Sequence, residues 1–141
     1  MGTPLIKEFY YDAPIEKVWR ALTDKDKIKK WYFPQLQQFD PVFGFTFQFD
    51  DGAEYQKEWI VTNVLEGKTL AHSWAYKGYP RSSEVIFDLF SEGYKTRLKV
   101  MQTDLDSFPT HPHFTRDRFD RGWDNLLGHN LKHLLEVSNN S

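Results

Sequence analysis

The stretch APIEKVWRALTDKDKIKKWY, residues 13–32, predicts one helix that ends at Thr23 and a second helix that begins directly after it. The apolar residues of the first half recur at helical spacing and share one face: Ile15, Val18, Trp19 and Leu22. Thr23 and Asp26 have the spacing of a capping box, in which Thr23 accepts a hydrogen bond from a free amide of the next turn. The second half has its own apolar stripe of Ile28, Trp31 and Tyr32. We therefore expect two short helices that change direction while both apolar faces reach one core.

Six other stretches have the composition of β-strands. They are rich in β-branched and aromatic residues, and turn sequences such as Glu66-Gly67 and Glu92-Gly93 separate them. The expected strands are residues 5–11, 43–49, 55–65, 69–76, 83–90 and 95–103. Short, even spacing of this kind favours an antiparallel meander.

Residues 115–137 predict one long C-terminal helix. Its inward stripe is formed by Phe119, Trp123, Leu126, Leu127, Asn130, Leu131 and Leu134. Gly122 and Gly128 fall inside this helix, where each glycine costs about 1 kcal/mol relative to alanine. We therefore expect either close packing or room for a guest molecule at these two positions.

This order of elements predicts a single α+β domain that spans residues 1–141. An antiparallel sheet of six strands must cover its apolar face, and the C-terminal helix is long enough to do so. Bulky aromatic side chains on a twisted sheet are expected to hold that helix away from the centre of the sheet. The sequence therefore predicts a cavity between sheet and helix.

Composition excludes several classes of partner and site. The chain has 18 basic and 20 acidic residues, so its net charge of -2 favours neither nucleic acid nor an anionic membrane. It has no cysteine, which excludes disulfides, thiolate nucleophiles and cysteine-ligated metals. Neither a leader pattern nor an apolar run of membrane-spanning length is present. We expect a cytoplasmic protein without membrane insertion and without a nucleic-acid partner.

Several motifs together with the order of elements resemble a known superfamily over nearly the whole chain. They are Ala13-Pro14, Val18-Trp19, Ala21-Leu22-Thr23, Trp31, Leu70 to Trp74, Thr96-Arg97-Leu98, Gly122-Trp123, Leu131, Leu134 and Leu135. The sequence resembles the START-like (SRPBCC, helix-grip, birch-pollen-allergen-like) superfamily. Within it, the chain is most similar to the C-terminal domain of the family named for the activator of the 90-kDa heat-shock-protein ATPase.

The resemblance implies a helix-grip fold, in which a curved six-stranded antiparallel sheet wraps around the C-terminal helix, with two short helices between strands 1 and 2. It also implies a space between sheet and helix where many members hold apolar molecules; other members are cyclases, lipid carriers or chaperone partners. Two positions depart from the family pattern. Trp59 stands where glycine is common, and Val42-Phe43-Gly44 replaces a pair of glycines. Large side chains at these positions are expected to narrow or reshape the cavity.

We expect an apolar small molecule or lipid-like ligand to bind in this cavity without covalent chemistry. The expected walls are Phe45, Phe47, Trp59, His72, Trp74, Val85, Phe87, Leu98, Phe119, Trp123, Leu127 and Asn130. Strand alternation in 69–76 places His72 on the inner face, where an imidazole orients a ligand or relays a proton. It also fits a buried neutral imidazole that a backbone group or a hydroxyl satisfies. Gln48 and Gln102 are further polar candidates.

The residues leave three functions open. In the first, the domain only binds its apolar ligand, as a monomer or homodimer, with no catalytic residue and no cofactor. In the second, it is a co-chaperone-like module that binds a chaperone protein and stimulates a heat-shock-protein ATPase. In the third, it is a polyketide-cyclase-like enzyme, which requires an acidic or hydroxyl partner for His72.

Two histidine pairs have spacings seen in metal sites. His111 and His113 lie close to acidic residues in one loop, and His129 and His133 are one helical turn apart. Neither pair has a defined third ligand, so a solvated loop and a solvated helix face explain them better. We expect no metal site.

Overall fold

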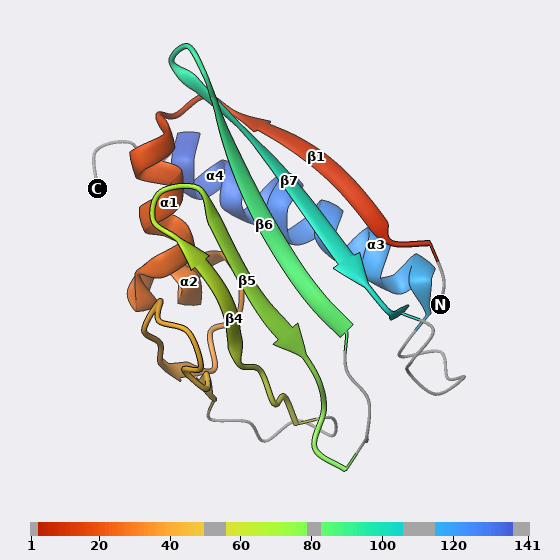
Figure 1. Cartoon of the computed structure of the whole chain (residues 1–141). Helices are drawn as coiled ribbons and strands as arrows, with labels where there is room; N and C mark the ends of the chain where they lie inside the picture. The colour runs from red at the N-terminus through yellow and green to blue at the C-terminus, as the bar shows by residue number, and fades with distance from the viewer. Residues whose placement is uncertain (1–2, 50–55, 79–82, 106–114, 137–141) are drawn as a thin grey trace.

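The computed structural model describes residues 3–49, 56–78, 83–105 and 115–136. It has the expected α+β architecture, built on an antiparallel sheet with the strand order β1-β7-β6-β5-β4. The strands are β1 (Leu5–Tyr11), β4 (Val61–Leu65), β5 (Thr69–Trp74), β6 (Ser83–Glu92) and β7 (Lys95–Thr103). The C-terminal helix runs along one face of this sheet, and two short helices lie beside it (Figure 1). The expected helix-grip arrangement is therefore confirmed.

The sheet has five strands rather than the expected six, because residues 43–49 contact residues 59–61 through an isolated bridge between Thr46 and Ile60 and form no continuous ladder with them. Only β3 (Gln48–Phe49) forms in this stretch, and it pairs with β2 (Leu36–Gln38) in a separate two-stranded sheet. Gly44 N still donates to Val61 O at 2.8 Å, but the φ of 86° at Gly44 interrupts the extended backbone. The expected strand 55–65 shortens to β4, because Ile60 N donates to the Ser73 hydroxyl instead of a backbone carbonyl.

The two short helices are α1 (Ile15–Thr23) and α2 (Lys25–Trp31). The break between them is where the sequence predicts it, but the cap is Asp24 and not Thr23. Asp24 Oδ2 accepts from Lys27 N at 3.1 Å, whereas the Thr23 hydroxyl donates to Trp19 O at 2.9 Å. Thr23 is still helical, so a carbonyl of the preceding turn is within its reach, while Asp24 has the extended backbone of a capping residue.

The C-terminal helix has a π-helical segment at its centre. It consists of α3 (Arg116–Asn125), the π-helical η3 (Leu126–Leu131) and α4 (Lys132–Glu136). The Tyr11 hydroxyl of β1 donates to the buried carbonyl of Leu127 at 2.8 Å, so a carbonyl in the wide turn finds its partner on the sheet. Neither this helix nor any other in the described residues is long and apolar enough to cross a membrane.

The two interior glycines of this helix differ in their surroundings. A Cβ atom built on Gly128 would lie 3.2 Å from Cε1 of Phe9 in β1, which is tighter than ordinary contact. A Cβ atom on Gly122 would meet no other atom within 4 Å. Close approach of helix and sheet therefore explains Gly128, and nothing in the described residues requires a glycine at 122.

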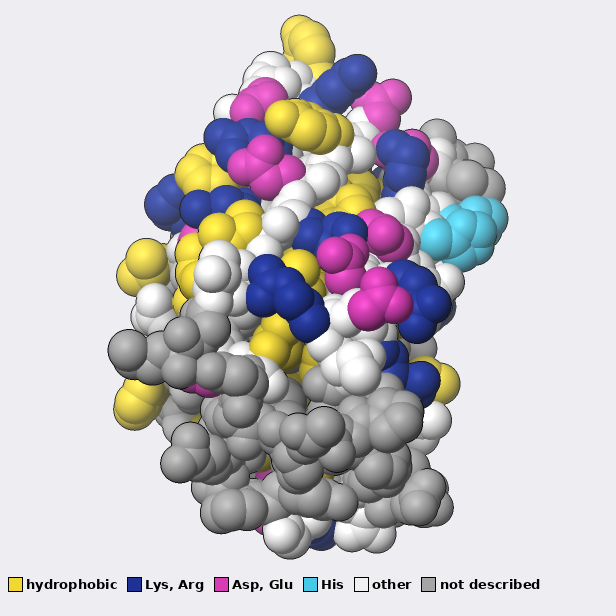
Figure 2. Space-filling view, turned by 90° about the vertical axis from the view of Figure 1, so that its right-hand side faces the viewer, with side chains coloured by type: hydrophobic (Ala, Val, Ile, Leu, Met, Phe, Trp, Pro, Cys, Tyr) yellow, Lys and Arg dark blue, Asp and Glu magenta, His cyan; other side chains and the backbone are white. Residues whose placement is uncertain are grey.

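β4 forms one edge of the sheet and β1 forms the other. A cluster of ion pairs joins β1 to α3. Lys7 lies on the inner side of β1, where its ammonium group pairs with Asp120 and, at 2.8 Å, with Asp124. Figure 2 views the molecule from this side and shows basic and acidic side chains interspersed there. Paired charges thus lie where the sheet edge meets the helix.

Candidate functional site

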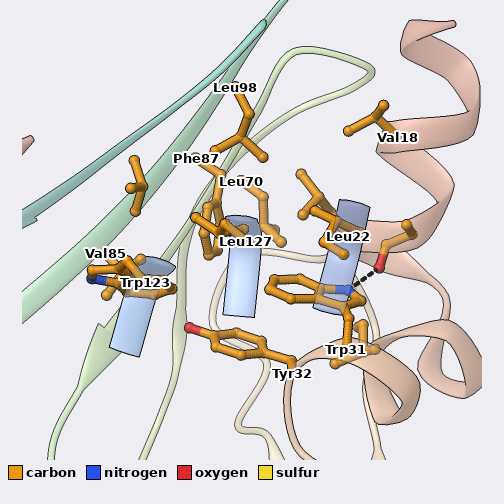
Figure 3. Packing of buried hydrophobic residues seen from close by; sticks show 14 of the residues in the cluster. Val18, Leu22, Trp31, Tyr32, Leu70, Val85, Phe87, Leu98, Trp123 and Leu127 are labelled. Carbon is orange, nitrogen blue, oxygen red and sulfur yellow. Dashed lines mark hydrogen bonds between the residues drawn. The ribbon is translucent and has the colours of Figure 1, made fainter. Parts of the chain in front are cut away.

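The inner face of the sheet holds a group of aromatic side chains. Alternation in β5 directs Leu70, His72 and Trp74 to this face, and all three are buried. Phe87 of β6 lies opposite Leu70 in the strand register. Trp123 of α3 covers them, with its ring centroid 5.8 Å from those of Phe87 and Trp74 (Figure 3). Sheet and C-terminal helix therefore meet through aromatic rings.

Tyr32, directly after α2, lies at the centre of this group. Its ring stacks on Trp31 with a centroid distance of 4.5 Å. Five other ring centroids lie between 5.4 and 6.5 Å from it: Trp59, His72, Trp74, Phe87 and Trp123. Trp31 Nε1 donates to Ala21 O at 2.8 Å, which fixes the angle between α2 and α1 (Figure 3). The change of direction between α1 and α2 therefore places the rings of Trp31 and Tyr32 against the inner face of the sheet.

Trp59 fills much of the remaining space. It is fully buried, and its ring centroid lies 4.3 Å from Trp74 and 4.6 Å from His72. Phe33 and Phe49 pack edge-on against it at 5.0 and 5.3 Å, and both of these rings are partly exposed. These contacts occupy the space in which the sequence predicts a cavity. A guest molecule must therefore displace side chains in order to enter.

We call the rings linked by these contacts the inner aromatic cluster. Its members are Tyr32, Phe33, Phe47, Phe49, Trp59, His72, Trp74, Phe87, Phe119 and Trp123. The cluster is fully enclosed at His72 and Trp59, and it reaches the surface through Phe33 and Phe49. The ammonium of Lys57 lies 4.7 Å above the ring of Phe33 and 5.4 Å above that of Phe49.

His72 has a partner on each ring nitrogen. Nδ1 lies 2.8 Å from the carbonyl oxygen of Ser73, which only accepts, so Nδ1 carries the hydrogen. Nε2 therefore accepts, and the Tyr32 hydroxyl donates to it at 3.0 Å. These contacts match the neutral, satisfied imidazole that the sequence offers as one interpretation.

Both members of this pair are uncharged at neutral pH. Burial lowers the pKa of His72 to about 4, although the hydrogen bond to Ser73 opposes that change. Burial, and then the nearby Tyr76, raise the pKa of Tyr32 well above its usual value. The pair therefore presents a neutral polar group inside the cluster. An imidazole of this pKa is a weak base, which does not favour proton abstraction at pH 7.

The structure brings most of the expected wall residues together. Buried members of the predicted set are Phe47, Trp59, His72, Trp74, Val85, Phe87, Leu98, Phe119, Trp123 and Leu127. Phe45 is half-buried and packs on Phe39 with a centroid distance of 6.1 Å, to one side of the cluster. Asn130 is half-buried, and its amide donates to Trp31 O at 3.4 Å, so it ties the π-helical segment to α2.

Gln102 is engaged in a buried polar chain. Its Oε1 accepts from Trp123 Nε1 at 3.0 Å, and its Nε2 donates to the Ser83 hydroxyl at 3.0 Å. This chain holds the Trp123 ring against the sheet. The other candidate amide, Gln48, is exposed and donates to the Thr46 carbonyl.

Three members of the cluster, Tyr32, Phe33 and Phe49, are absent from the set that the sequence predicts, and so is Trp31, which stacks on Tyr32. The apolar stripe that ends α2 contains Trp31 and Tyr32 and could have indicated them. Phe33 and Phe49 lie in irregular segments after α2 and in short β3. No periodicity indicates their direction, because their positions depend on contacts with Trp59 from a distant segment.

Two hollows lie outside the sheet–helix interface, and both are lined by residues that the structure describes. One, of about 560 Å³, lies beside α1 and is lined by Ile15, Glu16, Trp19, Arg20, Thr23, Pro41, Glu66 and Gly67. The other, of about 530 Å³, is lined by Thr46, Glu58, Ile60, Thr62, Ser73 and Ala75. In the first hollow, Trp19 Nε1 donates to Glu66 Oε2 at 3.2 Å. Neither hollow contains a residue of the predicted walls.

Metal ligands do not converge in the part of the chain that the structure describes. No group of three or more His, Asp or Glu side chains there is arranged to hold an ion. His129 and His133 are both exposed on the C-terminal helix. His111 and His113 lie outside the described residues.

A family model matches the chain over residues 12–136, and its description is Activator of Hsp90 ATPase homolog 1-like protein. The chain belongs to this family. The match includes all elements from α1 to α4, and therefore every residue of the inner aromatic cluster. The family resemblance that the sequence motifs predict is confirmed.

Solved structures share the fold of this family member. One is DynU16, a protein in the dynemicin biosynthetic locus, with a TM-score of 0.78 and 22% identity. The match covers 98% of this chain and 49% of DynU16, so this chain spans about half the length of DynU16. A second is MLL2253 from Mesorhizobium loti, with a TM-score of 0.76, 25% identity and coverage of 96% and 98%. A third is PFC0360w, an Hsp90 activator from Plasmodium falciparum, with a TM-score of 0.72, 20% identity and coverage of 99% and 97%. Among curated proteins, none matches the chain.

Proposed function

We propose that this domain binds an apolar small molecule in the inner aromatic cluster, without covalent chemistry. The observation that carries the proposal is the indole N–H of Trp59, which is fully buried and has no hydrogen-bond partner among the residues that the structure describes. A buried donor without a partner is unfavourable and rare in folded proteins. A bound molecule with an acceptor atom would supply the missing partner.

The surroundings of Trp59 support an apolar guest. Its ring neighbours are aromatic side chains, which offer large flat surfaces for burial. Phe33 and Phe49 are partly exposed and lie between Trp59 and solvent-accessible surface. Rotation of these two rings would open a route to Trp59 while His72 and Trp74 keep their places.

Two measurements on the purified protein test the proposal. Native mass spectrometry beside a denatured control reports any bound molecule as mass that is lost on unfolding. Titration with N-phenyl-1-naphthylamine, an uncharged apolar fluorophore, reports binding as increased fluorescence. We expect saturation with a dissociation constant on the order of 1–10 μM.

A pair of phenylalanine variants locates the bound fluorophore. Phe49→Ala removes a ring of the cluster and is expected to change the dissociation constant severalfold. Phe43→Ala removes a ring that is 80% exposed and lies outside the inner aromatic cluster, so the dissociation constant should not change. The proposal fails if the fluorophore does not saturate the protein, or if both variants behave alike.

A second candidate function is binding of a chaperone protein. The family description supports it, as does the similarity to the Hsp90 activator from Plasmodium falciparum. Phe43 and Tyr94 also present large side chains to solvent, with exposures of 80% and 92%, as interface residues do. Its test is a pull-down from lysate with wild-type protein and with a Phe43→Ser, Tyr94→Ser double variant. Stoichiometric recovery of a chaperone by the wild type alone would favour this function over ligand binding.

A cyclase-like activity has weaker support. It requires a hydroxyl or acidic partner for His72, and the Tyr32 hydroxyl is such a partner. However, both nitrogens of His72 are already engaged, and its low pKa makes it a poor base. The geometry therefore supports binding better than catalysis.

A further inference from the structure

The five tryptophans of this chain all lie within the described residues, which allows their indole N–H groups to be compared. Four of these groups have an oxygen partner. Trp19 donates to Glu66, Trp31 to the Ala21 carbonyl, Trp74 to the Tyr76 hydroxyl and Trp123 to Gln102, at 2.8 to 3.2 Å. The fold thus satisfies indole donors even where they are buried, and Trp59 is the exception.

The exception lies where the buried and the partly exposed rings of the cluster meet. On one side, Trp59 rests on His72 and Trp74, which are buried and hydrogen-bonded. Phe33 and Phe49 pack edge-on against Trp59 and are partly exposed, with the Lys57 ammonium over both of their rings. A molecule that takes the place of these two rings would lie against a fixed wall of rings.

The chemistry of this wall restricts the ligand. Flat rings pack best on aromatic faces, so the site favours a planar ring system over a flexible chain. The neutral Tyr32–His72 pair offers no opposite charge to an ion buried beside Trp59, where an unpaired charge is strongly disfavoured. The Lys57 ammonium lies at the partly exposed end of the cluster, over Phe33 and Phe49. The Trp59 N–H needs an acceptor, which a hydrocarbon lacks.

We propose that the ligand is a planar, uncharged aromatic molecule with a carbonyl or similar acceptor, and that Trp59 selects it by donating its indole N–H. This inference rests on the proposed function and adds the ligand class and the selecting residue. Trp59 stands where the resemblance implies glycine, so the selectivity would belong to this chain and not to the family pattern.

Fluorene and 9-fluorenone test this inference because they have the same flat ring system and differ in one carbonyl. Each is used to displace N-phenyl-1-naphthylamine from the full chain. We expect wild-type protein to bind fluorenone about tenfold more tightly than fluorene, which corresponds to about 1.4 kcal/mol. Trp59→Phe keeps a ring but removes the donor, and should abolish the preference. Trp19→Phe is the matched control, because Trp19 lies outside the inner aromatic cluster and its N–H already has Glu66 as partner, and it should keep the preference.

A second readout does not depend on the folding of a variant. In the nitrogen–proton correlation spectrum of the wild type, the indole resonance of Trp59 should move downfield with fluorenone and not with fluorene. Equal affinities of the two compounds, an unmoved Trp59 resonance, or equal loss of preference in both variants would overturn the inference. If N-phenyl-1-naphthylamine binds but neither compound displaces it, this inference fails and the proposed function stands. If the fluorophore itself does not bind, both fail.

Discussion

The Tyr32 hydroxyl donates a hydrogen bond to His72 Nε2 across 3.0 Å in the buried centre of the protein. This contact joins the residue that follows α2 to strand β5, between segments that are 40 residues apart. The Ser73 carbonyl sets the tautomer of His72, because Nδ1 donates to it and Nε2 is left to accept from Tyr32. The neutral imidazole of His72 therefore helps to attach the two short helices to the sheet.

Stability should fall as the pH is lowered below 6.5. Burial lowers the pKa of His72 from 6.5 to about 4, so the unfolded chain takes up a proton before the folded chain does. The stabilisation is complete above pH 6.5 and is lost progressively toward pH 4. About 2 kcal/mol should disappear between pH 7 and pH 5. Urea denaturation at a series of pH values measures this loss.

The variant His72→Phe is the control for that pH dependence. It is expected to be less stable at pH 7, since Tyr32 loses its acceptor. Its stability should nevertheless change much less between pH 7 and pH 5, because the titrating group is gone. An unchanged slope in this variant would show that other groups cause the pH dependence.

The cap between α1 and α2 can be tested with neighbouring alanine substitutions. Asp24→Ala removes the acceptor for Lys27 N and should lower the free energy of unfolding by about 1 kcal/mol. Thr23→Ala removes only a hydroxyl that donates back to Trp19 O, and it should have a smaller effect. Chemical denaturation distinguishes the two. The reverse order would indicate that Thr23 is the cap in solution.

The two helix glycines should respond to alanine with opposite signs. Gly122→Ala meets no atom within 4 Å and gains helix propensity, so it should stabilise the protein by about 1 kcal/mol. Gly128→Ala places a methyl group 3.2 Å from the Phe9 ring, and the resulting strain should offset or exceed that gain. Thermal unfolding of both variants checks the prediction. A similar increase for both would mean that the helix does not approach β1 this closely.

Tyr11→Phe should destabilise the π-helical segment. It leaves the buried Leu127 carbonyl without its partner, which costs about 1–3 kcal/mol. Amide hydrogen exchange should become faster in residues 126–131. The control is Tyr10→Phe, because the Tyr10 side chain is 55% exposed and its change should stay within about 0.5 kcal/mol. Equal effects of the two variants would contradict the role of this contact.

Much of the fold could be predicted from the sequence, because local patterns determine it. The strands at 5–11 and 95–103 have the predicted bounds, since side chains alternate regularly along both of them. The break after Thr23 was predictable from turn and cap chemistry, although the capping residue is one position later. Residues 43–49 have strand composition, but the backbone at Gly44 interrupts the extended conformation; in the expected strand 55–65, the Ser73 hydroxyl interrupts the ladder at Ile60.

The site was harder to predict than the fold. Alternation correctly places His72 and Trp74 on the inner face of β5. The partner of His72 is Tyr32, directly after α2, and no local pattern indicates that its hydroxyl reaches β5. Likewise, packing of Phe33 and Phe49 on Trp59 joins three segments that are far apart in the sequence. Contacts of this kind depend on the tertiary arrangement, which composition and spacing do not contain.

The ion pairs of Lys7 have a consequence for behaviour at high protein concentration. β1 is an edge strand, and such strands recruit strands of neighbouring molecules unless something prevents it. A strand added from another molecule would have to disturb the charged contacts that tie Lys7 to Asp120 and Asp124. This edge is thereby protected against intermolecular sheet extension, and aggregation through β1 is disfavoured as long as α3 stays in place.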